Sequence, residues 1–250
     1  AIIDWQSFSI RQEEKVCFKM APDAAVLNRV VSDEPSLIYG KLQADGRVFL
    51  VNQNGIVLGP DGRIETNGFV GASVAIDAQK FAEGELLFSD EPGALIEIDG
   101  EIFDQKQVLL VGGNINVNGR IFIAQKETTP AFPHNLADFS FTEGLFGAID
   151  ASAALTYDGL AIFCARQQIV VNGALQIPSG RLELSAEDIF ITQPATIDMN
   201  GPVGAIVKVV ARQTLDYQGQ ILAQTTAEKE PALVELSGLA HISCRGPVDL

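Results

Sequence analysis

From Ile38 to Ser73 the chain reads IYGKLQADGRVFLVNQNGIVLGPDGRIETNGFVGAS, in which runs of strand-forming residues alternate with Asp-Gly or Asn-Gly pairs. Val, Ile and Phe fit the half-buried surface of a pleated strand. Glycine adopts positive φ freely, and Asp and Asn side chains hydrogen-bond the backbone of a turn, so each pair marks a turn. This stretch therefore predicts short β-strands joined by tight turns.

The same punctuation continues along the rest of the chain. Asp-Gly or Asn-Gly pairs end at Gly46, Gly55, Gly62, Gly68, Gly100, Gly119, Gly173 and Gly201. Strand-like runs lie between them at residues 94–98, 108–111, 120–124, 168–171, 181–184, 188–191 and 206–210. Helical periodicity of any length is absent. An all-β fold is therefore predicted.

One recurring pattern sets the expected register between successive turns of the chain. It reads apolar-x-apolar-x-Gly, followed two residues later by a further apolar residue. It occurs at Ile96–Ile102, Ile115–Ile121 and Leu215–Ile221, with related forms at Ile169–Leu175 and Ile197–Val203. Gly100 and Gly119 are 19 residues apart, and Gly201 and Gly219 are 18 apart, which matches one turn of a parallel β-solenoid. An antiparallel sandwich is the competing architecture, because Asn-Gly also favours hairpins. Here, however, glycine stands within a continuing apolar alternation.

The first third of the chain resembles the two-partner-secretion domain of filamentous-haemagglutinin-type exoproteins. The resemblance is carried by Val26–Val30, Gly40–Leu42, Asn52–Ile56 and Ala72-Ser73. The family's turn reads Asn-Pro-Asn-Gly-Ile, and Gln53 replaces its proline, which removes a fixed φ. The resemblance implies a right-handed parallel β-helix with extra-helical hairpins or loops. It also implies one domain over residues 1–250, with capping strands within about residues 1–30.

The resemblance also implies a function. Such a domain is the N-terminal secretion module of a Gram-negative surface or secreted exoprotein of the adhesin or haemagglutinin type. Its partner is the set of periplasmic domains of a cognate outer-membrane β-barrel transporter, and the exoprotein passes through the periplasm to the cell surface or the medium. The rest of the exoprotein would bind a host-cell or glycan receptor. The residues assigned to transporter recognition or to the turn motif are Asn28, Asn52, Gln53, Asn54, Gly55 and Ile56.

Three segments are expected to leave the coil. The longest covers residues 126–149, where prolines and phenylalanines gather, and shorter ones cover Glu83–Gly93 and Thr225–Pro231.

At a strand spacing of about 4.8 Å, roughly ten to twelve coils would make a rod on the order of 50 Å long. The segment before Asn28 is expected to lie across its N-terminal end. The chain starts almost at the family's tryptophan strand, so a mature or trimmed fragment is expected.

Charge and hydropathy exclude two classes of partner. The net charge of −15 repels nucleic-acid phosphates and anionic lipid, and no basic stripe compensates for it. No run approaches the roughly 18 apolar residues of a membrane-spanning helix, so membrane insertion is not expected.

The residues suited to chemistry are few and scattered. Cys17, Cys164 and Cys244 lack the spacing of a zinc site or a disulfide framework and are expected to be buried thiols. His134 and His241 have no companion at ligand spacing. Most candidate aspartates precede glycine, where a turn explains them. We therefore expect no enzyme, metal or cofactor. The alternatives left open are a carbohydrate-binding or carbohydrate-cleaving β-helix of the pectin-lyase type and a purely structural fibre segment.

Overall fold

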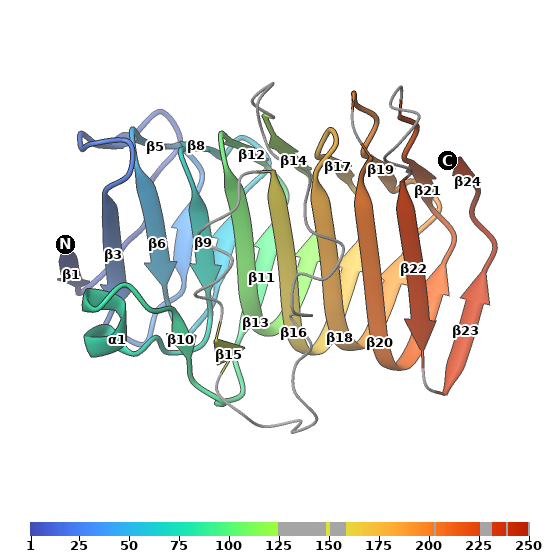
Figure 1. The fold of residues 1–250 in the computed structure, drawn as a ribbon. Coiled ribbons are helices and arrows are strands. Elements are labelled where there is room, and N and C mark those ends of the chain that lie inside the picture. The colour runs from blue at the N-terminus through green and yellow to red at the C-terminus, as the bar shows by residue number, and fades with distance from the viewer. Residues whose placement is uncertain (125–148, 151–158, 203, 226–231, 239, 250) are drawn as a thin grey trace.

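The protein is a parallel β-solenoid (Figure 1). The computed structural model describes residues 1–124, 149–150, 159–202, 204–225, 232–238 and 240–249. Each turn of the chain places one strand segment on each of three faces, and strands of successive turns pair in parallel. In Figure 1 the front strands point down, the chain returns behind them and each turn advances toward the C-terminus, which makes the coil right-handed. The expected parallel β-helix is therefore confirmed.

The strands of each face follow in chain order. The first face contains β1 (Ile2–Trp5), β3 (Ala25–Val30), β6 (Arg47–Val51), β9 (Phe69–Ala72), the first halves of β13 (Gln107–Val117), β16 (Leu160–Val171), β18 (Arg181–Ile191) and β20 (Ile206–Tyr217), and β22 (Leu233–Gly238). The second face contains β4 (Ser36–Ile38), β7 (Ile56–Leu58), β11 (Leu95–Ile98), the second halves of those four long strands and β23 (His241–Cys244).

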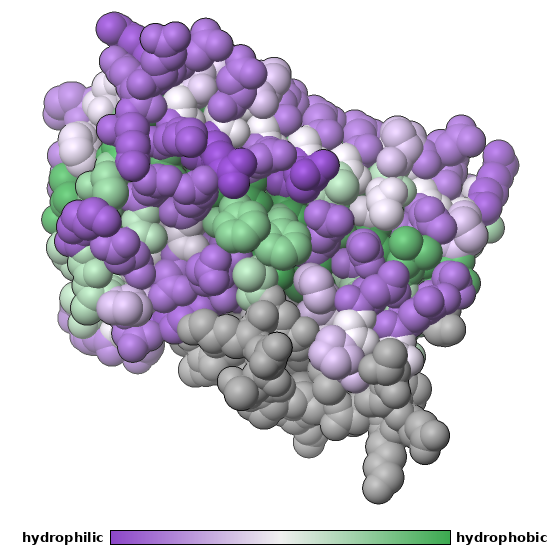
Figure 2. Space-filling view, turned by 90° about the horizontal axis from the view of Figure 1, so that it is seen from above, coloured by the Kyte–Doolittle hydropathy of each residue, from purple (hydrophilic) through white to green (hydrophobic). Residues whose placement is uncertain are grey.

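The third face is a separate nine-stranded sheet, seen from outside in Figure 2, where a hydrophobic patch lies among hydrophilic residues. It contains β2 (Lys15–Phe18), β5 (Lys41–Ala44), β8 (Arg63–Thr66), β12 (Glu101–Asp104), β14 (Arg120–Ile123), β17 (Ala174–Gln176), β19 (Thr196–Asp198), β21 (Gln220–Leu222) and β24 (Val248–Asp249). The described residues thus make nine coils, not the ten to twelve expected. The estimate assumed equal turns, whereas Ile96 pairs with Ile115, 19 positions on, and Ile189 pairs with Leu215, 26 positions on.

Columns of aliphatic side chains fill the interior of the solenoid. On the second face Ile96, Ile115, Ile169, Ile189 and Leu215 pair in succession, and each is fully buried. Strands of adjacent coils lie about 4.8 Å apart, so side chains in one column touch along their length. Burial of each side chain contributes roughly 1.5–3 kcal/mol. The register predicted from the repeats is confirmed for Ile96, Ile115, Ile169 and Leu215, whereas Ile189 was not among the predicted repeat positions.

The register predicted for Ile197–Val203 is wrong. Ile197 pairs with Leu175 and Ile221, which lie on the third face after the glycine of the repeat. Gly201 bridges to Thr225, so Gly201 and Gly219 do not occupy equivalent positions. Apolar residues alternate with the same period of two on the second and third faces, and the alternation alone does not distinguish them.

A ladder of polar side chains runs along the corner between the second and third faces. Asn118 Nδ2 donates to Asp99 Oδ1 at 2.7 Å, and Asn172 Nδ2 donates to Asn118 Oδ1 at 2.7 Å. Thr192 Oγ1 continues the ladder by donating to Asn172 Oδ1 at 2.7 Å. The Asp or Asn before glycine therefore links one coil to the next, besides turning the chain.

The glycine that follows each of these side chains lets the coils approach closely. A Cβ on Gly119 would lie 2.1 Å from the carbonyl oxygen of Gly100 and 2.4 Å from that of Asp99. A Cβ on Gly173 would lie 1.9 Å from the carbonyl oxygen of Gly119. Glycine is needed at this corner for space between coils.

A second apolar cluster lies on the outer side of the first face, where α1 (Ala78–Ala82) and β10 (Leu87–Phe88) pack against it (Figure 1). The Phe81 ring meets the Phe49 ring edge to face, with centroids 4.8 Å apart. The helix was not expected, because five residues are too few for a periodic signal. Its start is set by Asp77, whose side chain accepts from two backbone N–H groups in the first turn.

The outcome for the three predicted excursions differs. The one placed at Glu83–Gly93 begins earlier, because the chain leaves the coil after β9 and returns at β11. The one placed at residues 126–149 lies outside the described residues except for Ile149, which begins β15 (Ile149–Asp150) and pairs antiparallel with Phe88. The one at Thr225–Pro231 lies outside them except for Thr225.

The N-terminal segment continues the solenoid to its end. β1 pairs in parallel with β3, and β2 pairs in parallel with β5. Of the residues expected to lie across the end, β1 and β2 instead belong to the first coil, and Ala25 to Leu27 belong to β3 in the second. At this end Trp5 and Phe8 meet edge to face, with ring centroids 5.4 Å apart, and Phe8 is buried in the main core.

The three cysteines occupy different environments. Cys164 is buried, and burial raises the pKa of its thiol to about 12. Cys17 and Cys244 are exposed, so the expectation of three buried thiols is wrong for these two. Cys17 is an outward residue of β2 that pairs with Gln43, and Cys244 lies on β23 in the last described coil, where it pairs with Tyr217.

A buried carboxyl group braces the corner between β12 and β13. Asp104 Oδ2 accepts from Thr66 Oγ1 at 2.6 Å, and Oδ1 accepts from the backbone N–H groups of Lys106 and Gln107 at 2.7 and 2.9 Å. Burial raises the pKa of Asp104 to about 6, although the hydrogen bonds to Thr66 and to the backbone oppose the shift.

Gly119→Ala is expected to lower the free energy of unfolding by roughly 3 kcal/mol or more, because its methyl group meets backbone oxygens that cannot move independently of the coil. Gly84→Ala is the control, since Gly84 has φ +90° but no atom within 4 Å of the added Cβ. It should cost only about 1 kcal/mol of backbone strain. Equal costs for the two variants, measured by urea unfolding, would contradict the crowding argument.

The raised pKa of Asp104 predicts that the folded protein becomes more stable on mild acidification. Its folded pKa lies above its unfolded value, so the folded state binds more protons between about pH 4 and 6. The stability from this group is complete below about pH 4 and is lost as the pH rises through about 6. Between pH 7 and pH 5 the wild type should therefore gain about 1 kcal/mol relative to Asp104→Asn. Parallel pH profiles of unfolding for the two proteins would refute this role.

Candidate functional site

Asn52–Ile56 form a tight turn at the corner between β6 and β7. The N–H of Gly55 donates to the carbonyl oxygen of Asn52 at 3.0 Å, which closes the turn. Gly55 has φ +111°, and a Cβ there would lie 2.8 Å from the carbonyl oxygen of Leu95 in the next coil. The turn therefore requires glycine both for its backbone conformation and for space.

Asn52 is the buried centre of this turn. Its Nδ2 donates to the carbonyl oxygen of Glu34 at 2.9 Å and to Ser36 Oγ at 3.0 Å. Its Oδ1 accepts from the N–H of Asn54 at 3.0 Å. Asn54 Nδ2 in turn donates to the carbonyl oxygen of Ser32 at 2.7 Å. The two amide side chains thus fasten the turn to the preceding coil.

Only part of the motif is accessible in the folded domain. Gln53 and Asn54 are exposed, whereas Asn52, Gly55 and Ile56 are buried. Gln53 Nε2 donates to Glu91 Oε2 at 2.7 Å, so this replacement for the family's proline contacts the segment that leaves the coil. A protein that binds the folded turn can reach two of its five side-chain positions.

Asn28 lies inside the solenoid, apart from the turn. Its Oδ1 accepts from Trp5 Nε1 at 3.0 Å, and its Nδ2 donates to the carbonyl oxygen of Phe49 at 3.2 Å. Asn28 pairs with Leu50 and is fully buried. Its contacts join the first three coils, and the structure does not bring it together with the exposed residues Gln53 and Asn54.

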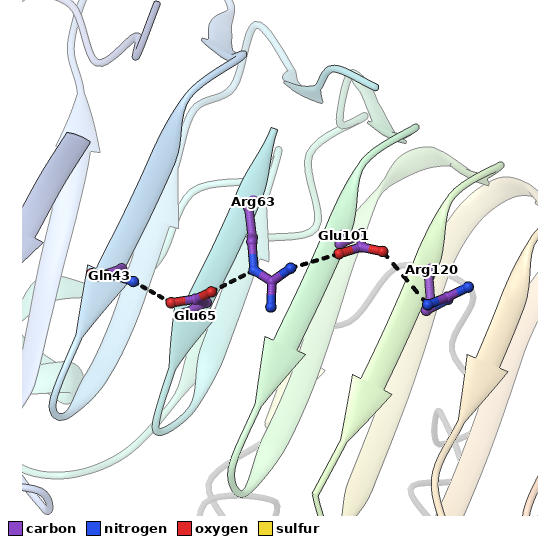
Figure 3. A network of polar contacts seen from close by, with 5 residues as sticks. All are labelled: Gln43, Arg63, Glu65, Glu101 and Arg120. Atoms are coloured by element: carbon purple, nitrogen blue, oxygen red, sulfur yellow. Dashed lines mark hydrogen bonds and ion pairs between the residues drawn. The ribbon is translucent and has the colours of Figure 1, made fainter. Parts of the chain in front are cut away.

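A polar network on the third face was not found from the sequence (Figure 3). Glu65 accepts from Gln43 and from Arg63, and Arg63 also donates to Glu101 Oε2 at 2.8 Å. Arg120 lies 3.6 Å from Glu101 Oε1. Partial burial raises the pKa of Glu65, but the hydrogen bonds from Arg63 and Gln43 dominate and lower it overall. The sequence signal is the Arg-x-Glu spacing of outward positions, and the contacts between coils need the register as well.

The described residues contain no group of three or more His, Cys, Asp or Glu side chains placed to hold a metal ion. Asp99 takes part in the corner ladder, and Asp104 accepts from Thr66 and from backbone groups, so hydrogen bonds that hold the coils explain both aspartates. No helix in the described part of the chain is long and apolar enough to span a membrane.

Asn52→Ala is expected to lower the free energy of unfolding by about 1–3 kcal/mol, because the buried Ser36 hydroxyl and backbone groups of Glu34 and Asn54 lose their hydrogen bonds. Gln53→Ala is the matched control within the same turn. Its side chain is exposed and bonds to one exposed carboxylate, so a change within about 0.5 kcal/mol is expected. Thermal and urea unfolding of both variants measure the difference, and a larger loss for Gln53→Ala would contradict this assignment.

Two proteins similar to this chain are heme/hemopexin-binding proteins. A heme/hemopexin-binding protein of Haemophilus influenzae is 41% identical over 71 residues, which are 28% of this chain and 8% of that protein. A heme/hemopexin-binding protein of Haemophilus influenzae strain Rd is 29% identical over 195 residues, which are 74% of this chain and 20% of that protein. The chain therefore spans at most a fifth of the length of these relatives.

The fold has a solved counterpart. The crystal structure of the HMW1 secretion domain from Haemophilus influenzae aligns over 99% of this chain and 90% of its own, with a TM-score of 0.52 and 20% sequence identity. At this identity the likeness establishes the fold alone. The family model named TPS secretion domain matches residues 1–232, and the chain therefore belongs to the family of two-partner-secretion (TPS) domains.

Proposed function

We propose that residues 1–250 act as one secretion module, which the periplasmic domains of a dedicated outer-membrane transporter recognise. The observation that carries the proposal is the family match over residues 1–232, which span eight of the nine coils. Membership of the family implies an outer-membrane transporter as partner in general, and secretion of the exoprotein across that membrane. The periplasmic site of contact and the role of particular residues are the finer steps proposed here.

The cargo belongs to the part of the exoprotein beyond this module. Relatives of the module are named for heme and hemopexin binding and for HMW1, so a surface or released exoprotein that binds a host ligand is consistent with them. We propose an adhesin-type exoprotein whose remaining length contacts a host-cell or glycan receptor. The module itself contributes export.

Recognition of the Asn52–Ile56 motif depends on the state of the chain. In the folded domain a partner can touch Gln53 and Asn54, whereas Asn52 and Ile56 are covered by neighbouring coils. A transporter that reads the whole motif must therefore meet it before this corner folds. Unfolded strands offer free backbone groups, and β-augmentation by a periplasmic domain is a physical route for such recognition.

Folding of the chain at the outer surface favours continued export over return through the transporter. Each coil contacts only its neighbours, so folding propagates one coil at a time as chain becomes available. Every added coil buries several aliphatic side chains at about 1.5–3 kcal/mol each. Return of the chain through the transporter would require exposing them again, which disfavours backsliding.

The test is export of a reporter fused after residue 250, in cells with and without the cognate transporter. Asn54→Ala is expected to lower export several-fold while the purified domain keeps its β-type circular dichroism. Asn118→Ala is the matched control, because Asn118 is also a corner asparagine with two side-chain hydrogen bonds, but it lies outside the motif. It should be exported normally.

The outcomes separate three claims. Export without the transporter would remove the proposed module function. Unchanged export of Asn54→Ala would remove the site. Equal losses for Asn54→Ala and Asn118→Ala would mean that stability of the coil, and not recognition of the turn, limits export.

A further inference from the structure

An open groove lies on the N-terminal half of the third face, apart from the Asn52–Ile56 turn. Its volume is about 900 Å³, within the range of ligand sites. Gln43, Glu65 and Phe103 form its floor, from outward positions of three successive strands. One wall is the loop that contains Lys19 and Pro22. Its lining also includes Cys17, Asn67 and Gln105.

Contacts to distant coils hold the loop wall in place. Asn67 Nδ2 donates to the carbonyl oxygen of Pro22 at 2.8 Å. Lys106 Nζ lies 2.9 Å from Asp23 Oδ1, and the Lys106 side chain is only 11% exposed. These contacts connect the loop after the first coil to the third and fourth coils. The groove is therefore formed before any ligand arrives, which reduces the entropic cost of binding.

Phe103 presents one free ring face to this groove. Its other face stacks on Phe122, with ring centroids 4.8 Å apart and 20° between the planes. Phe103 pairs with Phe122 on one side and with Glu65 on the other. The groove is lined by Phe103 and Glu65 but not by Phe122, so it lies on the unstacked side of the ring. An apolar ring face beside a carboxylate suits a ligand that has both a C–H surface and hydroxyl groups.

The polar floor is pre-organised. Glu65 is held by Gln43 and Arg63, and Arg63 is held by Glu101 (Figure 3). A carboxylate oxygen accepts more than one hydrogen bond, and the amides of Asn67 and Gln105 add donors and acceptors at the groove edge. Fixed planar groups of this kind match the hydroxyls of a sugar without the cost of ordering them first.

Charge and backbone pairing narrow the choice of ligand. Lys19 faces Asp45 at 3.4 Å, and Arg63 faces Glu65, so the charged groups lining the groove balance in sign. Balanced charges in the groove provide no electrostatic attraction for an acidic glycan. The net charge of −15 on the whole chain repels such a glycan. The floor strands β5 and β8 are paired on both sides, which leaves no backbone edge for an added peptide strand.

We propose that this groove binds a neutral oligosaccharide, with one sugar ring packed on the free face of Phe103 and its hydroxyls bonded to Glu65 and the edge amides. The proposal adds a binding activity to the secretion module and does not depend on the transporter. It concerns binding alone.

The first experiment screens the purified domain on neutral tri- and tetrasaccharides of glucose, galactose, mannose and N-acetylglucosamine, with sialylated and uronic-acid counterparts. The strongest neutral binder is then titrated by calorimetry. Phe103→Ala should weaken its affinity at least tenfold. Phe190→Ala is the matched control, since Phe190 is a partly buried outward phenylalanine on the second face. It should bind like the wild type.

The exposed cysteines provide a second readout that leaves the fold intact. Cys17 lines the groove and Cys244 lies on β23, away from it. The bound neutral oligosaccharide should slow alkylation of Cys17 by a maleimide at least fivefold and leave Cys244 unchanged. A bulky maleimide on Cys17 should in turn block binding, also if Phe103→Ala proves unstable.

Several results would overturn the proposal. It fails if no neutral oligosaccharide binds at millimolar concentration, or if acidic glycans bind more tightly. It also fails if binding persists when Cys17 carries the bulky adduct, or if the sugar protects Cys244 as well as Cys17. Failure of these tests leaves transporter-dependent export of the reporter unaffected, so the two proposals are judged separately.

Discussion

The register of each coil on the next is the constraint on which the rest of the structure depends. Parallel pairing aligns equivalent positions of successive coils. An aliphatic column such as Ile96, Ile115 and Ile169 is therefore shielded from water only if every coil stays in register. A slip by one residue would turn the column outward and expose it. The corner ladder through Asn118 and the crowded Gly119 hold this register from the side.

The same register builds the outer surface. Outward positions also stack, so side chains far apart in sequence become neighbours: Glu65 and Phe103, 38 residues apart, form one floor. The Asn52 turn is attached to the previous coil in the same way, through Ser36. Both sites are products of stacking, and neither exists in an isolated coil. Loss of register between the second and third coils would disturb both sites, because the Asn52–Ser36 and Gln43–Glu65 contacts both join these two coils.

Much of the fold could be predicted from local pattern, because turn residues and period-two alternation are short-range signals. The column through Ile115 and the turn at Gly55 are of this kind. The position of Ile197 could not be predicted, since the second and third faces alternate alike and the turns between them differ in length. The five-residue helix, the exposure of Cys17 and the groove beside Phe103 also depend on which coil lies next to which. Glycine and asparagine marked the turn site, whereas no sequence signal marked its burial.

The contacts of the Trp5 indole affect which part of the chain folds first. Asn28 holds it while also bonding to the carbonyl oxygen of Phe49, so one amide side chain connects three successive coils. A chain delivered gradually from its N-terminus cannot complete this set of contacts until Phe49 has arrived. We therefore expect the first three coils to form together, and later coils to add one at a time to a structure that already exists.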